Sequence, residues 1–251
     1  MDSLFDEILV VIPARGGSKR ITKKNIRKIN GFPMILWPLE VLSNMFPAEN
    51  VVVSTDSTLI KQTIELTGLN VPFMRPEQLS DDFTGTVAVV QHALRWFEDN
   101  IRSVKYVLTV YPTAVLITQD DIMAAIASMA ADTSCDGVMP AIQYPSPIQR
   151  AVFEDEYGYA SMFHPEQYST RTQDLKCALH DAGQFYLNTA ESIRKGKVLT
   201  NSKIKLQKID KSRVIDIDTL TDFNIADDRL RTFKGSLDLK SCQFWNIGKE
   251  K

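Results

Sequence analysis

The stretch ILVVIPARGGSKR, Ile8–Arg20, decides the fold of this chain of 251 residues. It opens with a continuously apolar run, which is typical of a strand covered on both faces of a sheet. Pro13 ends the run, and the adjacent Gly16 and Gly17 allow the backbone to turn tightly and to approach a ligand. In an open α/β sheet, ligands bind at the carboxyl ends of the strands. The sequence therefore predicts a ligand site directly after the first strand.

Apolar runs of strand length recur along the chain, at Val51–Ser54, Lys105–Val110, Gly137–Ala141, Gln184–Asn188 and Arg213–Ile217. Helical patterns alternate with them and start at Ser57, at Thr86, at Thr118 (in a capping box with Asp121) and near Thr219. Phe32–Met45 also has a helical pattern, but Pro38 should kink this helix or move its start. Repeated strand–helix–strand units predict an α/β fold with a mainly parallel central sheet and helices on both faces.

Composition excludes several classes of protein. Hydrophobic residues make up 44% of the chain and charged residues 24%, values typical of a globular domain. A net charge of -2 argues against a surface devoted to nucleic acid. The three cysteines are widely spaced and suit neither a disulfide framework nor a CxxC metal site. With no signal peptide and no membrane span in the pattern, we expect a cytoplasmic protein.

The regular rhythm is interrupted once. We expect one domain over residues 1–234, with an insertion at 143–181 and a C-terminal tail at 235–251. The insertion is too long for an ordinary loop, and it carries the apolar and aromatic residues Ile148, Val152, Phe153, Tyr159, Met162, Phe163 and Tyr168. An isologous homodimer would bury them. The alternative is a lid that folds back over the site of a monomer.

The loop after the first strand is strongly basic. No acidic residue lies among Arg15, Lys19, Arg20, Lys23, Lys24, Arg27 and Lys28. Backbone N–H groups in such a turn form an anion-binding concavity, although the loop is neither a Walker A motif nor a GxGxxG motif. A nucleic-acid patch usually contains aromatic side chains for stacking, and this stretch has none. We therefore predict a phosphate site rather than a solvated basic loop or a nucleic-acid surface.

Two aspartates stand near the end of the chain, in the sequence RVIDIDTLTD. Asp216 and Asp218 are two residues apart, so on a strand both side chains would lie on one face and Ile217 on the other. Adjacent carboxylates repel each other unless a cation separates them, and Mg²⁺ binds through one or two carboxylates plus substrate phosphates. We predict that the pair holds Mg²⁺. The alternatives are an exposed strand end, or an Asp218 that only caps the last helix.

Taken together, these motifs resemble the CMP-sugar synthetases, a family that includes the synthetases for sialic acid, for KDO and for related nonulosonic acids. The resemblance rests on IPARGGSKR, on KKN at 23–25, on VSTDS at 53–57 and on IDID at 215–218. FMRPEQLSDDFTGT at 73–86, RTQDL at 171–175 and HDAGQFY at 180–186 are most similar to the branch that activates pseudaminic acid. The resemblance implies a Rossmann-like nucleotidyltransferase fold, CTP and an acidic nine-carbon sugar as substrates, Mg²⁺ as cofactor, and a homodimer built through the insertion.

The resemblance also implies roles for individual residues. Arg15 and Lys24 match positions that contact the triphosphate, and Asp216 and Asp218 match the metal ligands. The nucleotide pocket corresponds to Ala14, Arg15, Gly16, Gly17, Ser18, Lys24, Asn25, Arg75, Ser80 and Asp81. The sugar region corresponds to Tyr111, Thr113, Arg171, Gln173, His180, Asp181 and Gln184.

The sugar region departs from the sialic-acid synthetases. They have Gln-Pro-Thr at the positions of Tyr111, Pro112 and Thr113, and Asn-Gly-Ala near Asp181–Gln184. We therefore expect CMP transfer from CTP to a nonulosonic acid, with pseudaminic acid preferred over N-acetylneuraminate. A synthetase for sialic, legionaminic or KDO sugars, a catalytically silent nucleotide-binding regulator and a nucleic-acid module remain as alternatives.

Overall fold

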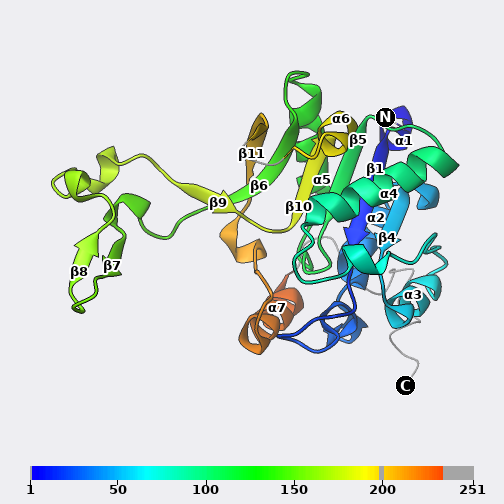
Figure 1. Ribbon diagram of the computed structural model, residues 1–251, viewed down its shortest axis with the longest axis horizontal. Helices are drawn as coiled ribbons and strands as arrows, with labels where there is room; N and C mark the ends of the chain where they lie inside the picture. Colours follow the sequence, from blue (N-terminus) through cyan, green and yellow to red (C-terminus); the bar gives the residue numbers. More distant parts are fainter. Residues whose placement is uncertain (1, 198–200, 234–251) are drawn as a thin grey trace.

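A computed structural model describes residues 2–197 and 201–233, so the expected tail at 235–251 lies outside the described residues. The centre of the molecule is a sheet in the order β11-β6-β10-β5-β1-β4, with β9 beside β6 (Figure 1). Its strands are β1 (Ile8–Pro13), β4 (Val51–Ser54), β5 (Tyr106–Val110), β6 (Gly137–Gln143), β9 (Leu179–Asp181), β10 (Phe185–Thr189) and β11 (Ile204–Lys208).

The sheet is mainly parallel. β1 runs parallel to β4 and β5, and β6 runs parallel to β11. β10 lies antiparallel between β5 and β6, and β9 is antiparallel to β6. The parallel strands all point their carboxyl ends to the same edge, and the predicted ligand loop begins at that edge.

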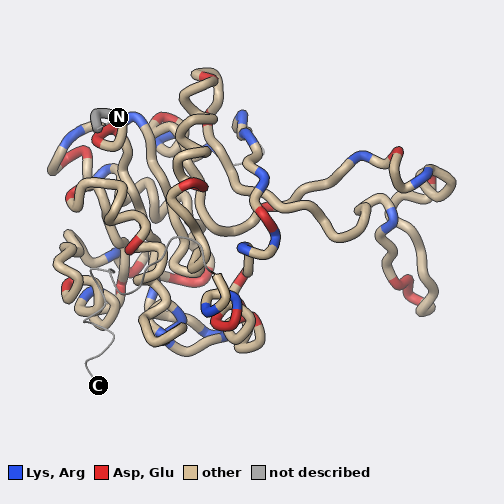
Figure 2. Tube along the Cα trace, turned by 180° about the vertical axis from the view of Figure 1, so that it is seen from behind, with Lys and Arg blue, Asp and Glu red and all other residues tan. Residues whose placement is uncertain are grey.

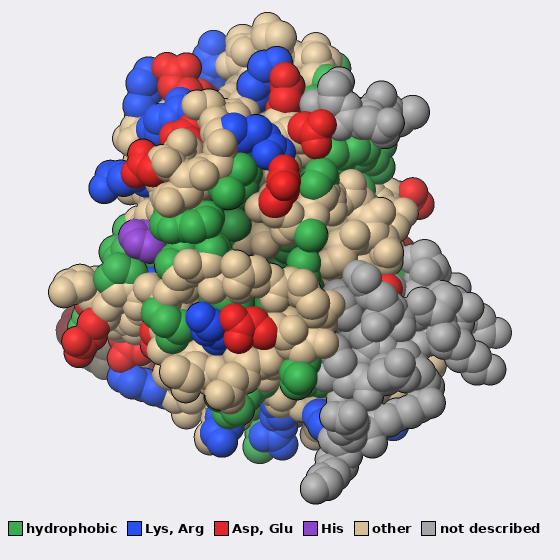
Figure 3. Space-filling model, turned by 90° about the vertical axis from the view of Figure 1, so that its right-hand side faces the viewer, with side chains coloured by type: hydrophobic (Ala, Val, Ile, Leu, Met, Phe, Trp, Pro, Cys, Tyr) green, Lys and Arg blue, Asp and Glu red, His purple; other side chains and the backbone are tan. Residues whose placement is uncertain are grey.

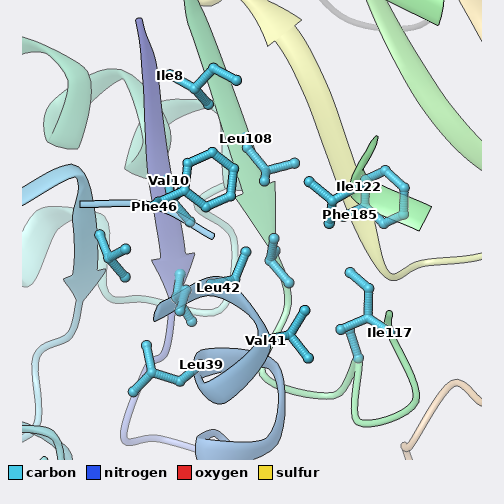
Figure 4. Packing of buried hydrophobic residues seen from close by; sticks show 14 of the residues in the cluster. Ile8, Val10, Leu39, Val41, Leu42, Phe46, Leu108, Ile117, Ile122 and Phe185 are labelled. Atoms are coloured by element: carbon cyan, nitrogen blue, oxygen red, sulfur yellow. The ribbon is translucent and has the colours of Figure 1, made fainter. Parts of the chain in front are cut away.

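Helices cover both faces, as the sequence predicted. Alternate residues of β1 face opposite sides: Leu9 and Val11 pack with α4 (Thr86–Asn100) and α6 (Ala190–Arg194), whereas Ile8 and Val10 pack on the other face. That second face is covered by α2 (Leu36–Ser43), α3 (Thr58–Glu65) and α5 (Gln119–Ala130). Figure 4 shows the second face, where Leu39 and Leu42 of α2 point toward β1.

The helix ends follow the capping residues. Ser57 caps α3, and Thr118 with Asp121 forms the capping box of α5. The last helix, α7 (Leu220–Thr232), begins with a second capping box, between Thr219 and Asp222. Pro38 moves the start of α2 to Leu36, so the proline falls in the first turn, where its missing N–H has no partner to lose.

Short elements complete the body. α1 (Asp2–Asp6) precedes β1, and β2 (Lys28–Ile29) pairs with β3 (Phe32–Pro33). A third apolar cluster joins this hairpin to α7 and includes the fully buried side chain of Ile217. None of the helices within 2–197 and 201–233 is both long and apolar enough to cross a membrane.

The prediction of a strand at Arg213–Ile217 is wrong. Lys211–Arg213 is a 3-10 turn, and the residues from Val214 to Asp218 run outside the sheet. The strand in this part of the chain is β11, at the sheet edge. Its sequence is IKLQK, and none of its side chains is fully buried, as is common at a sheet edge.

Residues 144–178, between β6 and β9, form an arm that extends away from the body (Figure 1). Its outer part contains the hairpin β7 (Val152–Glu154) and β8 (Ala160–Met162). Most of the arm's trace is neither acidic nor basic (Figure 2). On the side of the body away from the arm, acidic and basic side chains lie among hydrophobic ones (Figure 3). The middle of the segment expected as an insertion therefore projects from the body, whereas its two ends, Gln143 and Leu179–Asp181, pair with each other in the sheet.

Candidate active site

The loop after β1 is held against the end of β4. The N–H of Gly16 donates to Oδ1 of Asp56 at 2.7 Å, and Asn25 Nδ2 donates to the carbonyl of Arg15 at 2.9 Å. A Cβ atom at Gly16 would lie 2.8 Å from Cβ of Ser57, which is too close for any side chain. Glycine is therefore required by the close approach of the two loops. The backbone of the phosphate-loop candidate is fixed before any ligand binds.

Arg15 reaches a second turn that lies above this loop. Its Nη1 is 2.7 Å from Oδ1 of Asp82 and donates to the carbonyl of Asp81 at 3.2 Å. Lys19 also pairs with Asp82. The turn keeps its shape because Asp81 accepts from the N–H groups of Phe83 and Thr84. Hydrogen bonds from Thr84, first from its side chain and then from its backbone, lower the pKa of Asp81. The Ser80–Asp81 turn and Arg15 are thus brought together, as expected.

The aspartate pair meets the basic loop from the opposite end of the sequence. Lys24 Nζ donates to the carbonyl of Ile217 at 2.7 Å and lies 3.4 Å from Oδ1 of Asp218. Arg20 pairs with the other oxygen of Asp218 at 2.7 Å. Buried Ile217 turns inward, so Asp216 and Asp218 both lie on the outer side, although no strand imposes the alternation.

The carboxylate of Asp216 makes no hydrogen bond or ion pair with another described residue. Partial burial, followed by the negative charge of Asp218, raises the pKa of Asp216. In the described residues no group of three or more His, Cys, Asp or Glu side chains could hold a metal ion. Asp216 and Asp218 are neighbouring carboxylates, and Asp216 has no hydrogen-bond partner among the described residues. Such a pair suits a hard cation such as Mg²⁺, which takes its other ligands from phosphate oxygens and water.

Two hollows flank the basic loop. Arg15, Ser18, Lys24 and Asn25 line the first together with Tyr111 and Thr113. The second is lined by Gly16, Gly17 and Asp56 and shares Arg15 and Asn25 with the first. Cationic side chains therefore line both hollows, among them Arg15, Lys24 and Lys23, which suits a chain of phosphates and an attached nucleoside.

Arg75 has a structural partner at the end of β4. Its buried side chain donates from Nε to Oγ of Ser54 at 3.1 Å and from Nη2 to the Ser54 carbonyl. Burial lowers the pKa of Arg75, while the neighbouring Asp56 opposes this shift. Arg75 thus binds the end of β4, two residues before Asp56 of the second hollow, and lines neither hollow itself.

The predicted sugar region forms around β10. Tyr111 and Thr86 share a hydrogen bond of 2.9 Å, and the ring of Tyr111 packs edge-to-face on Tyr186. Tyr186 donates its hydroxyl to the Asp181 carboxylate. These side chains line a cavity of about 220 Å³ whose other walls include Val90 and Met139. Tyr111 also lines the first hollow of the phosphate loop, so cavity and hollow share a wall.

The remaining predicted sugar residues lie elsewhere. His180 Nδ1 lies 2.9 Å from the carbonyl of Asp181, and its ring packs against Tyr144 of the arm. Gln184 is buried, and its Nε2 donates to the carbonyl of Arg213 at 2.8 Å. Arg171 and Gln173 are exposed on the arm, and no hydrogen bond or ion pair links either side chain to the described part of the body. Within one chain they are not brought to the loop.

Sequence reasoning missed three residues of this site: Asp56, Asp82 and Tyr186. Asp56 follows β4 directly, at the carboxyl end of the strand beside β1, and this position was a usable signal. Asp82 and Tyr186 had no such signal, because only the folded chain places them opposite Arg15 and Asp181.

A basic glycine loop after the first strand and an aspartate pair beside it, on a mainly parallel α/β sheet, are the arrangement of a nucleotide-binding enzyme of the nucleotidyltransferase class. The chain belongs to the cytidylyltransferase family, whose profile matches residues 9–209.

Related proteins support this assignment. The chain is 34% identical to a pseudaminic acid cytidylyltransferase of Campylobacter jejuni, over 87% of its own length and 94% of the relative's. It is 30% identical to a CMP-N,N'-diacetyllegionaminic acid synthase of Legionella pneumophila, over 88% and 94%. The fold is that of CMP-2-keto-3-deoxy-manno-octonic acid synthetase, solved in complex with CTP. That match has a TM-score of 0.68 at 16% identity and covers 90% of this chain and 99% of the other.

Proposed function

We propose that this protein transfers CMP from CTP to the anomeric hydroxyl of a nonulosonic acid, pseudaminic acid above others, and releases pyrophosphate. The observation that carries the proposal is the meeting of Lys24 with Asp218 and the Ile217 carbonyl. This contact brings the phosphate loop and the carboxylate pair to one place. The similarity to the Campylobacter jejuni enzyme supports both the reaction and the choice of sugar.

The chain's own groups would act by position and charge. Nucleotidyl transfer needs alignment of the reacting groups and neutralisation of the phosphates more than covalent help from the protein. Arg15 and Lys24 line the first hollow and would hold the triphosphate, and the N–H of Gly17, which lines the second hollow, would add a further donor. Asp216 and Asp218 would hold Mg²⁺, which when bound neutralises phosphate charge and makes a bound hydroxyl more acidic.

The sugar would sit against Tyr111, which lines both the hollow of the phosphate loop and the cavity toward β10. The cavity offers apolar walls and a polar rim of Thr86, Asp181 and Tyr186. A sugar with several hydroxyl groups and apolar acyl or methyl substituents matches this mixture.

We also propose that the protein is a homodimer built through the arm. Arg150 donates to the carbonyls of Tyr168 and Thr170 at 2.6 and 2.5 Å, and Phe153 packs on Phe163. These contacts give the arm a shape of its own, yet its large apolar side chains stay 40–76% exposed. A second copy of the chain would cover them and would bring a partner's Arg171 toward the sugar.

The test is pyrophosphate release with CTP and a panel of pseudaminic, legionaminic, N-acetylneuraminic and KDO sugars. We expect release with a nonulosonic acid present, fastest with pseudaminic acid, and none with CTP alone. Replacing CTP by UTP or ATP is the control for the base. Equal rates with N-acetylneuraminate would reject the sugar preference, and no release with any sugar would reject the reaction.

A further inference from the structure

The segment that carries the aspartate pair has no strand partner. From Lys211 to Asp218 the backbone passes through a 3-10 turn and then runs outside the sheet. Carbonyl groups in such a segment receive no ladder hydrogen bonds and take donors from side chains or water. The position of the two carboxylates therefore depends on whatever side chains hold this backbone.

Arg229 of α7 makes most of the side-chain hydrogen bonds to this backbone segment. Its Nη1 donates toward the carbonyl oxygens of Lys211, Ser212 and Val214, at 3.3, 3.0 and 3.1 Å. Its planar guanidinium presents its N–H groups in fixed directions. One side chain of the last helix thus hydrogen-bonds three backbone carbonyls that precede Asp216.

Other parts of the chain fix the neighbouring carbonyls. Gln184, just before β10, donates to the Arg213 carbonyl at 2.8 Å, and Lys24 donates to that of Ile217 at 2.7 Å. The Arg213 guanidinium forms a two-bond ion pair with the buried Asp121, which raises the pKa of Arg213. Four separate parts of the chain therefore contact this short segment, through Arg229, Gln184, Lys24 and Asp121. Arg229 donates to more of its backbone carbonyls than either Gln184 or Lys24 does.

We propose that Arg229 is a positioning residue: it holds the segment 211–218 so that the carboxylates of Asp216 and Asp218 face the phosphate loop. It is not among the residues that line either hollow, so it acts through the backbone rather than on substrate. Ile217, packed in the same apolar cluster as Phe223 of α7, adds a second link between this helix and the segment. The inference rests on the proposed function, because it takes the aspartates as the metal pair.

The test compares Arg229→Ala with Arg231→Ala. Both arginines lie on α7, but Arg231 pairs with Asp227 and Asp228 of its own helix, with no hydrogen bond to the segment. Mn²⁺ is titrated in the presence of CTP and followed by electron paramagnetic resonance. Loss of an outer-shell partner typically weakens metal binding about 10- to 100-fold. We expect a weakening in that range for Arg229→Ala and none for Arg231→Ala.

Hydrogen exchange of the amides at 214–218 is the second readout, and it should accelerate in Arg229→Ala alone. Equal Mn²⁺ affinity and equal exchange in the two alanine variants would overturn the inference. Arg229→Met keeps a long side chain but has no donor, so it should match Arg229→Ala in both readouts. If Arg229→Ala does not fold, wild-type Mn²⁺ affinity in Arg229→Met would overturn the inference. A wild-type protein that binds Mn²⁺ but transfers no CMP would overturn only the proposed function.

Discussion

The hydroxyl of Tyr186 donates a hydrogen bond to the carboxylate of Asp181 across a kink between two strands. β9 and β10 both run antiparallel to β6, one after the other along the same edge. Between them the chain turns at Gly183, whose φ of +62° suits glycine and whose N–H donates to Asp181 at 2.8 Å. Asp181 thus closes the kink at both of its oxygens and is fixed at the rim of the cavity.

Tyr186→Phe tests whether this pair serves the sugar. Burial and the neighbouring Asp181 raise the pKa of Tyr186, so it remains a neutral donor over the whole working range of pH. Without the hydroxyl, Asp181 loses a donor to a charged group, an interaction typically worth about 1.5–3 kcal/mol. We expect a higher KM for the sugar and an unchanged KM for CTP. Tyr106→Phe on β5 is the control, because no described residue hydrogen-bonds that hydroxyl. A changed KM for CTP alone would contradict the assignment.

Gly16→Ala and Gly17→Ala separate close approach from mere flexibility. The new Cβ at Gly16 would lie 2.8 Å from Cβ of Ser57, whereas the one at Gly17 has nothing within 4 Å. The first substitution must push the loop away from Asp56, and displacements of this kind lower turnover by roughly 100-fold. We expect Gly17→Ala to stay near wild type in steady-state assays. Similar losses in both variants would show that loop flexibility, and not packing, is what matters.

The fold was largely predictable because its buried parts leave strong patterns. The continuous apolar runs of β1 and β4 and the capping residues of α3, α5 and α7 gave these elements nearly at their observed bounds. Burial on both faces and side-chain caps are local properties, visible in a single stretch of sequence.

The errors come from long-range partners. RVIDI alternates like a strand, but its carbonyls accept hydrogen bonds from Arg229, Gln184 and Lys24 instead of a ladder. Ion pairs between residues far apart in the chain, such as Arg15 with Asp82, leave no local sequence pattern either. The phosphate loop could be predicted because it follows a strand. The arrangement around it could not, because it depends on which turns the fold places beside that loop.

Asp216→Asn should lose activity and gain stability. A carboxyl with a raised pKa binds more protons in the folded than in the unfolded state, so stability falls as pH rises above the ordinary value of 3.8 through the folded pKa. At neutral pH the amide removes this cost. We expect a higher melting temperature at pH 7 in chelator-treated buffer, no difference below pH 3.8, and a loss of turnover with CTP and Mg²⁺.

Asp222→Asn is the control, because the pKa of Asp222 is shifted in the opposite direction to that of Asp216. Hydrogen bonds from Thr219 lower the pKa of Asp222, so its ionised form stabilises the fold above the ordinary pKa and this contribution is lost as pH falls. The variant should be less stable than wild type at pH 7. If Asp216→Asn also lowers the melting temperature at pH 7, the effect assigned to the burial of Asp216 and to its neighbour Asp218 is wrong.

Arg15→Ala and Arg171→Ala should affect different kinetic constants. Arg15 lines both hollows and would stabilise charge that develops on the phosphates, so its loss should lower turnover by roughly 10²–10³-fold. Arg171 would bind the carboxylate of the sugar equally in ground and transition states, so its loss should mainly raise the KM for the sugar. Steady-state kinetics with each substrate varied in turn decide this. A change in the CTP parameters alone would remove Arg171 from the sugar site.

The arm makes a final prediction, about which chain supplies Arg171. The arm extends from the body (Figure 1). In one chain Arg171 lines neither the hollow of the phosphate loop nor the cavity, and it makes no side-chain hydrogen bond or ion pair with a described residue of either. A site shared between two chains would combine the loop of one copy with the arm of the other. Mixing Arg171→Ala with Asp218→Asn, each inactive at low sugar concentration, should then restore activity. About one quarter of the wild-type rate is expected, because half of randomly re-paired dimers are heterodimers with one intact site.

Each variant mixed with itself is the control, and the mixture is left to exchange subunits below the dimer dissociation constant before concentration. The bulky apolar side chains of the arm, such as Tyr157, Tyr159 and Tyr168, are more than 70% exposed in one chain, so dilution should also lower the specific activity of the wild type. A stable dimer without rescue would place Arg171 in its own subunit. A scattering mass of one 28.3 kDa chain in the fully active enzyme would exclude the shared site altogether.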